Sequence, residues 1–514
     1  MQINNRTKVV FKDYCPNQIL LLPPSLEEMI EPNHPVRVVN QVIDSLDIES
    51  LINKYKGGGC SSYHPRLLLK VLVYGYLTNQ YSSRKIEQAL SQNIHFMWLS
   101  GMSYPDHNTI NRFRSDRLKG VLKEVFSQVV LLLVEKGVIT LKEAYLDGTK
   151  IEANANRYTF VWGRSIKKSK ERIKKQLGEL WSYAESVARE ELENNEPGSF
   201  EKIDQESVLR TIESIDKALN GKHIDKKVKQ KLGYARKNWT ENLKKYEQQE
   251  KTLGNRNSYS KTDPDATFMR MKEDHMLNGQ LKPGYNWQIS TENQYILGYT
   301  IHQTTNDTTT LQAHLESLND NLGKMPDTLV ADAGYGSEEN YEYLENNDVE
   351  AFVKYPYFHK EQSKKWKDDP YRTDNLPYDD NDDSYTCPMG QKMNFIGEKV
   401  RISDNGFRQA NRLYQAQDCK NCPVRETCNK STYNRRIEIN PRLNQYKSII
   451  RKRLTSERGI KYRSKRPVEV EAVFGMIKGN RNYRKFLLRG LEKVEIEVGL
   501  LALAHNLNKI AARN

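Results

Sequence analysis

Two aspartates in this 514-residue chain close short apolar runs and are followed within two residues by a glycine. Asp147 stands in AYLDGT, and Asp332 stands in DTLVADAGYG. Such runs are typical of buried strands, and a sheet presents chemistry at the ends of its strands. Two carboxylates brought together repel each other, and a divalent cation that prefers oxygen ligands, Mg²⁺ or Mn²⁺, relieves that repulsion. We therefore predict that Asp147 and Asp332 share a metal site.

Glu471 is the candidate for a third acid, on a helix that we expect to begin at Pro467 and to carry a buried apolar stripe. Three acids would hold two metal ions, which bind the attacking and leaving oxygens of a phosphoryl transfer. Lys478 follows Glu471 by seven residues, so two helical turns bring both side chains to nearly the same angle. The lysine can then take a DNA phosphate while the glutamate binds metal. An ordinary amphipathic helix is the alternative.

The positive charge of the chain is concentrated around this helix. The chain has 80 Lys and Arg against 66 Asp and Glu, a formal charge of +14. Between Arg451 and Arg489 there are thirteen Lys and Arg residues and three Glu residues, which is a local excess of ten. Such a concentration favours a polyanion partner, above all nucleic acid, over a merely solvated helix face.

The first part of the chain, residues 1–138, is predicted to be a helical DNA-binding domain. Its apolar residues have helical spacing, and two short helices separated by a turn resemble a helix-turn-helix. The second of these helices carries Arg112 and Arg114, which are our candidates for reading DNA sequence. A helical bundle with a basic surface is the alternative.

Strands and helices alternate in three later segments, 139–163, 255–358 and 441–514, which predicts an α/β core with helices over a mixed sheet. Two insertions interrupt it. Residues 164–254 are charged and favour helix, so we expect an inserted helical hairpin that acts as a spacer or arm. Residues 359–440 are acidic at first and then contain cysteines.

Four cysteines in this second insertion have the spacing C-x31-C-x2-C-x5-C, at Cys387, Cys419, Cys422 and Cys428. Six cysteines in all are too few for a disulfide scaffold in a chain of this length. Four thiolates can hold a structural Zn²⁺ in a zinc ribbon. Reduced thiols without a metal are the alternative.

Three blocks of this sequence resemble bacterial insertion-sequence DDE transposases. They are YLDGTKIEANANRYTFVWG, VADAGYGSEENYEYL and RSKRPVEVEAVFGMIKGNRNYRKFLLRGLEKVEIEVGLLALAHNLNKI, and LLPPSLEEMIEPNHPVRVV and PDHNTINRFR resemble the opening of the same group. The resemblance implies a ribonuclease H-like core and a Mg²⁺-dependent triad, Asp147, Asp332 and Glu471. Members nick DNA at terminal inverted repeats and join the freed 3′ hydroxyl to target DNA.

The related group has a Tyr, Arg, Glu, Lys signature around its last acid. Glu471 and Lys478 fit it, but the position four before Glu471 is Pro467, which leaves the arginine to be Arg463 or Arg466. Tyr462 is the nearest tyrosine. The residues that we expect at DNA phosphates, or close to them, are Tyr462, Arg463, Arg466, Lys478, Arg481, Arg484, Lys485 and Arg489.

The sequence therefore predicts a DDE transposase, with a metal-dependent nuclease that lacks strand transfer and a non-catalytic DNA-binding regulator as the alternatives. Its partners would be terminal inverted repeats and target DNA, and the resemblance implies a homodimer in the active complex. No apolar run approaches the ~18 residues of a membrane helix. The first residues do not have the pattern of a secretory signal. We expect a cytoplasmic, nucleoid-associated protein.

Overall fold

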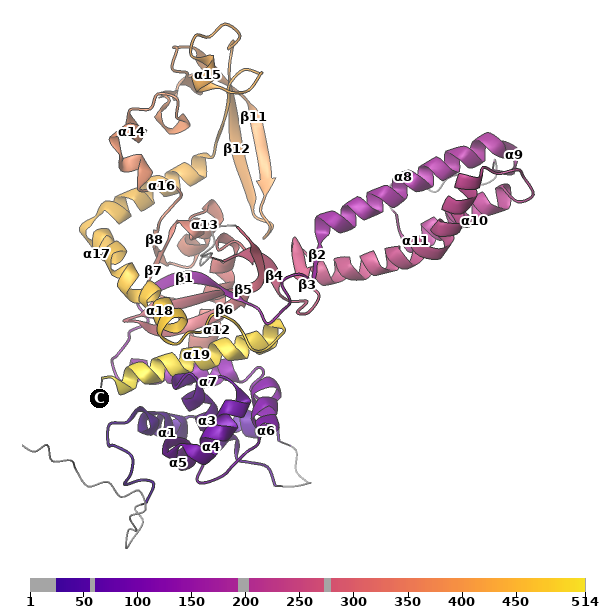
Figure 1. The fold of residues 1–514 in the computed structure, drawn as a ribbon. Coiled ribbons are helices and arrows are strands. Elements are labelled where there is room, and N and C mark those ends of the chain that lie inside the picture. Colours follow the sequence, from indigo (N-terminus) through magenta and orange to yellow (C-terminus); the bar gives the residue numbers. More distant parts are fainter. Residues whose placement is uncertain (1–24, 56–60, 193–202, 272–278, 514) are drawn as a thin grey trace, which may run out of the picture.

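The computed structural model describes residues 25–55, 61–192, 203–271 and 279–513. Figure 1 shows a central body of sheet and helices, from which a long helical arm and a smaller β-sheet protrude in different directions. Among the described residues, no helix has the length and apolar character needed to cross a membrane.

The centre of the body is a six-stranded mixed sheet whose middle strand is β1 (Glu143–Glu152). On one side β1 pairs antiparallel with β5 (Leu281–Glu292), and on the other it pairs parallel with β7 (Thr328–Ala331). This arrangement confirms the predicted mixed sheet. The outer strands are β6 (Tyr295–His302) and β4 (Thr267–Arg270), both antiparallel to β5, and β8 (Glu350–Val353), parallel to β7.

Helices pack against this sheet from both the middle and the end of the chain. A short 3-10 turn, η2 (Thr308–Thr310), leads into α12 (Leu311–Leu322), which packs against β6, while α13 (Glu338–Asn346) packs against β8. α19 (Leu491–Ala511) contacts β6 on one side and the N-terminal helices on the other (Figure 1). All residues from Val498 to Leu507 are buried, because a helix held between two layers has no solvent face.

The N-terminal part is helical, as predicted. Its core helix is α3 (Pro65–Leu77), which packs on α1 and α19. The other helices are α1 (Pro35–Ser45), α2 (Glu49–Ile52), α4 (Ser83–Gln92), α5 (Ile94–Leu99), α6 (His107–Arg112), the π-helical turn η1 (Phe113–Arg117) and α7 (Leu122–Glu135).

A helical arm leaves the core between β2 (Phe160–Trp162) and β3 (Ser258–Ser260), two short strands that pair antiparallel. Its helices are α8 (Gly163–Val187), α9 (Arg189–Leu192), α10 (Gln205–Ala218) and α11 (Lys226–Leu253). The arm has its own apolar cluster, in which Trp181 of α8 and Trp239 of α11 are buried. Figure 1 shows it projecting away from the sheet.

A second protrusion is a five-stranded antiparallel sheet with the order β13-β12-β11-β10-β9. Its strands are β9 (Tyr378–Asp379), β10 (Ser384–Thr386), β11 (Lys392–Ile402), β12 (Arg408–Ala416) and β13 (Arg436–Ile439). The connecting turns and helices are η4 (Lys360–Gln362), α14 (Lys364–Lys367), η5 (Thr373–Asn375) and α15 (Arg425–Cys428). The chain then returns to the body through α16 (Pro441–Thr455), which packs against β8.

Buried histidines make the fold sensitive to acid. Burial lowers the pKa of His505 to about 4 and that of His314 to about 3. The unfolded chain binds protons below pH 6.5 while the folded chain does not, so stability is complete above that pH and falls as the pH drops towards 4. We expect a loss of about 3 kcal/mol at most for His505, measured as the free energy of unfolding between pH 7.5 and pH 4.5. A His505→Gln variant should show a shallower pH dependence, and an equal slope in both proteins would contradict this account.

Candidate active site

Asp147 and Asp332 lie next to each other where the ladder between the parallel strands β1 and β7 stops. The pairing of β1 with β7 stops at Leu146 and Ala331, and the residue that follows each of them is an aspartate. The prediction that a strand ends at Asp147 was wrong, because the ladder to β5 carries β1 on to Glu152. The Asp147 side chain is almost fully buried, whereas 40% of the Asp332 side chain is exposed.

The turn after β7 holds the Asp332 carboxylate in place. Asp332 caps a 3-10 turn, η3 (Ala333–Tyr335), and its Oδ1 accepts a hydrogen bond from the Gly334 backbone N–H at 2.8 Å. On β1, Asp147 Oδ1 accepts from the Gly148 N–H at 2.8 Å. Each carboxylate is therefore oriented by a backbone N–H that is close to it in sequence.

Glu471 comes from a long, irregular helix. We predicted that this helix begins at Pro467, but it begins earlier in the chain. Ser456 caps α17 (Glu457–Arg466), and the chain continues without a break into a π-helical turn, η6 (Pro467–Glu471). Proline lacks the N–H that would bond back to the Arg463 carbonyl. The turn that follows is π-helical and is closed by the Ala472 N–H on the Pro467 carbonyl. The helix goes on as α18 (Ala472–Gly475) and a second π-helical turn, η7 (Met476–Asn480).

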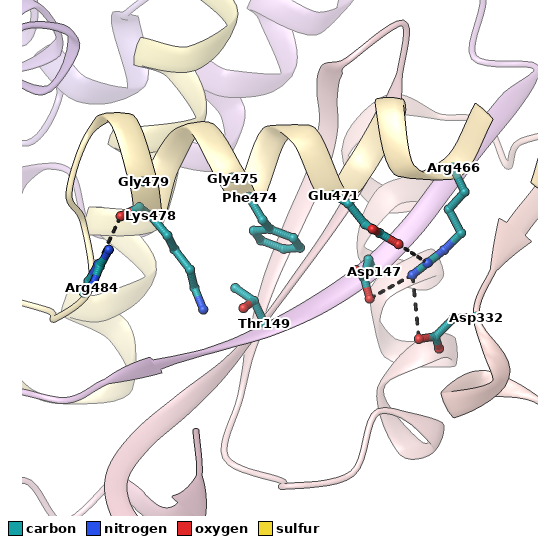
Figure 2. A pocket seen from close by; sticks show the side chains of 10 residues that line it. All are labelled: Asp147, Thr149, Asp332, Arg466, Glu471, Phe474, Gly475, Lys478, Gly479 and Arg484. Atoms are coloured by element: carbon teal, nitrogen blue, oxygen red, sulfur yellow. Dashed lines mark hydrogen bonds and ion pairs between the residues drawn. The ribbon is translucent and has the colours of Figure 1, made fainter. Parts of the chain in front are cut away.

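The Arg466 guanidinium lies among the three acids (Figure 2). Its Nη1 is 2.6 Å from Glu471 Oε1, and its Nη2 is 3.1 Å from Asp147 Oδ1 and 3.7 Å from Asp332 Oδ2. The Arg466 side chain is only 8% exposed. Three carboxylates that are far apart in sequence therefore converge on one buried cation.

The π-helical turn also decides which arginine this is. Arg466 stands five residues before Glu471, and the extra residue of the turn lies between them. Arg463 is not part of the cluster, because its guanidinium lies over the Phe358 ring, 5.3 Å from the centroid. Tyr462 is buried and donates to Glu143 Oε1 at 2.9 Å, so it joins α17 to β1.

A cavity of about 540 Å³ opens over the acids. Beyond the three carboxylates and Arg466, its lining residues are Thr149, Phe474, Gly475, Lys478, Gly479 and Arg484. Lys478 Nζ donates to the Lys150 carbonyl at 3.2 Å, and Arg484 Nε donates to the Lys478 carbonyl at 3.3 Å (Figure 2). One wall of the cavity is thus acidic and the opposite end is basic.

The donor set fits a divalent cation. Three carboxylates from β1, η3 and the π-helical turn already surround a positive group, and their oxygens are the ligands that Mg²⁺ and Mn²⁺ prefer. No group of three or more His, Cys, Asp or Glu side chains in the described residues is arranged to hold a metal ion, and the Arg466 guanidinium lies among the three acids. Metal binding at this cluster therefore requires the guanidinium to move aside.

A buried polar network below the acids was missed by the sequence analysis. The amides of Asn286 and Gln288 on β5 donate to Asp307 Oδ1 at 2.7 and 3.1 Å, and the Tyr335 hydroxyl donates to Gln288 Oε1. Burial, and then the nearby carboxylates, raise the pKa of Tyr335 well above its ordinary value, so it remains a donor. The network ties β5 to the turn that carries Asp332. Its signal in the sequence was the alternation of polar residues in a strand that is buried on both faces.

Lys354, next to the end of β8, is a second cation near the acids that the sequence analysis missed. Burial chiefly lowers its pKa, and Arg466 lowers it further, whereas Asp332 and Glu471 raise it. The acids are therefore close to two basic side chains.

Gly148 is required by the close approach of β5. A Cβ at this position would collide with the side-chain amide of Gln288, its partner across the ladder. We expect Gly148→Ala to lower the free energy of unfolding by about 1–3 kcal/mol, because a packed interior resists added volume. Gly178→Ala on the arm, where nothing lies within 4 Å, is the matched control and should be neutral or slightly stabilising. Equal stability of both variants in thermal unfolding would contradict this argument.

Four of the predicted DNA contacts are buried: Tyr462 and Arg466, whose contacts are given above, and Arg481 and Arg114. Arg481 is 6% exposed and donates to the Tyr76 carbonyl at 3.1 Å, and burial lowers its pKa. Arg114 is 4% exposed and donates to the Tyr81 carbonyl at 2.8 Å. The Arg481 bond joins α3 to the C-terminal part, and the Arg114 bond stays within the N-terminal part. Neither side chain can reach a DNA base or phosphate in this structure.

The remaining predicted contacts are at least partly exposed. Arg112 at the end of α6 is exposed. Lys485 is half exposed and lies 3.5 Å from Glu152, while Arg489 Nε donates to the Asn154 carbonyl at 2.8 Å. Arg484 lines the cavity itself. Lys485 and Arg489 therefore lie at the end of β1 and just beyond it.

The four cysteines of the second insertion are reduced and partly exposed. Cys419 Sγ accepts from the Arg435 N–H at 3.3 Å, and Cys428 Sγ accepts from the Arg435 guanidinium at 2.9 Å. Cys387 Sγ accepts from the Gln391 N–H at 3.3 Å. Within the described ranges they do not form a group arranged to hold a metal ion.

A mixed sheet that places two aspartates side by side, under a helix that brings a glutamate to them, defines the ribonuclease H-like class. Residues 386–511 match the family model described as "Transposase DDE domain", and residues 24–116 match the one described as "Transposase domain (DUF772)". Both matches support an insertion-sequence DDE transposase, as the sequence resemblance implied. The first match includes Glu471 and the four cysteines, and Asp147 and Asp332 lie outside both matches. No curated protein matches the chain.

Proposed function

We propose that this transposase binds the terminal inverted repeats of its insertion sequence, cleaves the DNA there and joins the 3′ ends to target DNA. The convergence of Asp147, Asp332 and Glu471 on one cation carries the proposal, because carboxylates so arranged fit a site for two divalent metals. When bound, such metals, Mg²⁺ in the first place, activate the attacking oxygen and stabilise the leaving 3′ oxygen.

The protein's own side chains position the DNA. Lys478 and Arg484 line the cavity within reach of a phosphate that enters it, and they would neutralise its charge. Arg466 would leave the carboxylates and turn to the same phosphate, since a guanidinium binds phosphate oxygens as readily as carboxylate oxygens. Lys485 and Arg489 would hold the strand further along β1.

The division of labour along the chain is part of the proposal. Residues 1–138 would bind the terminal repeat, with Arg112 as the exposed candidate for sequence reading. The segments 139–163, 255–358 and 441–514 would form the catalytic core, and the protein would act as a homodimer on DNA in the cytoplasm. For the cysteine-bearing insertion, 359–440, a structural Zn²⁺ on the four cysteines remains a proposal.

The test uses DNA that carries the inverted repeats flanking this gene. We expect nicks at the repeat ends in the presence of Mg²⁺, none with EDTA, and none with a Glu471→Gln variant that still binds the same DNA. Cutting without joining to a target duplex would indicate a nuclease. Tight binding without cutting by either protein would indicate a DNA-binding regulator, and cutting by the variant would mean that Glu471 is not the third acid.

A further inference from the structure

The first half of α8 has a row of exposed cations on one face. Between residues 164 and 175, Glu171 is the single acid among seven Lys and Arg residues. Six of the seven are exposed, and we call them the α8 stripe: Arg164, Lys167, Lys168, Arg172, Lys174 and Lys175. Among the described residues, none of the six forms an ion pair, whereas the seventh, Lys170, pairs with Glu250 at 2.6 Å.

The fold of the arm determines where these cations point. Ile166, Ile173 and Leu177 are buried on the opposite side of α8, against the rest of the arm. Because buried and charged residues repeat with helical spacing, the stripe occupies the face of α8 that is turned to solvent. The arm holds α8 as one straight element of 25 residues, so the cations keep a fixed spacing.

The stripe begins where the cations of the active-site region end. α8 directly follows β2, and β2 follows β1, the strand of Asp147, after a short connection. Around that connection Arg157 and Lys485 pair with Glu152, and Lys282 lies 3.9 Å from it, so three basic side chains surround one carboxylate. Basic side chains therefore surround the end of β1. Figure 1 shows that the chain passes through β2 into the foot of the arm.

We propose that the α8 stripe binds the phosphate backbone of duplex DNA next to the segment held at the acids. The inference rests on the proposed function. Eleven helical steps span about 17 Å, and a duplex offers roughly one phosphate charge per 1.7 Å of its axis, so the stripe can meet several phosphates. Lysine and arginine on a smooth helix face reach phosphates without reading bases, so the contact is independent of sequence.

The test compares two full-length variants with the same loss of charge. The stripe variant is Lys167→Gln, Lys168→Gln, Arg172→Gln and Lys175→Gln. The control is Lys226→Gln, Lys227→Gln, Lys229→Gln and Lys237→Gln, four exposed cations on α11 of the same arm. Dissociation constants are measured from 50 to 200 mM salt, with a duplex that ends at the repeat and with one that extends about 40 base pairs beyond it. Thermal unfolding checks that both variants fold.

We expect the stripe variant to bind the longer duplex 10- to 100-fold more weakly. The magnitude of the slope of log K against log salt should decrease by about two to four. Its binding to the shorter duplex, and that of the control to both, should stay as in the wild type. Unchanged slopes overturn the proposal. If the slope is unchanged and self-association of the protein is altered, the stripe contacts a protein and not DNA, which also overturns the proposal. This experiment measures binding and not cutting. The stripe can therefore be tested even if the protein does not cut DNA. A stripe variant that binds like the wild type would not contradict the proposed cutting activity.

Discussion

An Asp332→Asn variant will keep its fold and its affinity for DNA ends but lose DNA cutting by at least about 10³-fold. In the proposed two-metal site the charge of Asp332 would bind metal, and a neutral amide at this position would not replace it. The amide keeps an oxygen to accept from the Gly334 N–H, so the turn at η3 should survive. The measurement is single-turnover nicking of repeat-end DNA at saturating Mg²⁺.

Asp327→Asn is the matched control for this experiment. Asp327 stands at the other end of β7, is 55% exposed and pairs only loosely with Lys324 at 3.3 Å. Surface pairs of this kind contribute less than about 1 kcal/mol. Cutting should therefore be unchanged. If Asp332→Asn still cut DNA at a tenth of the wild-type rate or faster, Asp332 would not be a metal ligand.

Replacing Arg466 should increase the stabilisation of the protein by divalent metal. In the absence of metal, Arg466→Gln leaves three carboxylates facing one another without their cation, which should cost about 3–5 kcal/mol of the free energy of unfolding. Divalent metal then supplies the missing charge without having to displace a guanidinium. We therefore expect Mn²⁺ to raise the melting temperature of the variant much more than that of the wild type.

Arg463→Gln on the same helix is the control, because that guanidinium lies over Phe358 and does not touch the acids. It should leave the response to Mn²⁺ as in the wild type. DNA cutting by Arg466→Gln should fall by about 10²-fold at saturating metal if the arginine also holds the phosphate. Equal shifts by Mn²⁺ in the wild type and in Arg466→Gln would show that the arginine does not compete with metal.

The sequence by itself determined the local features of this protein. Apolar periodicity indicated helices at the N-terminus and alternating strands and helices afterwards, because those patterns record which side of an element is buried. The position of Asp332 at the end of an apolar run indicated a site residue, and helical spacing placed Glu471 and Lys478 on the same face of a helix. The excess of positive charge around Arg451–Arg489 pointed to nucleic acid. Resemblance to a family then selected the three acids.

Only the tertiary structure decided what these residues meet. Nothing in the spacing around Pro467 shows that a π-helical turn carries Arg466 into the acids, because the extra residue is accommodated by the packing of the whole helix. The sequence also could not show that Arg114 and Arg481 are buried between the N-terminal helices and the core. An arginine looks the same in a sequence whether it faces solvent or a carbonyl, and only the contacts between distant segments separate the two cases.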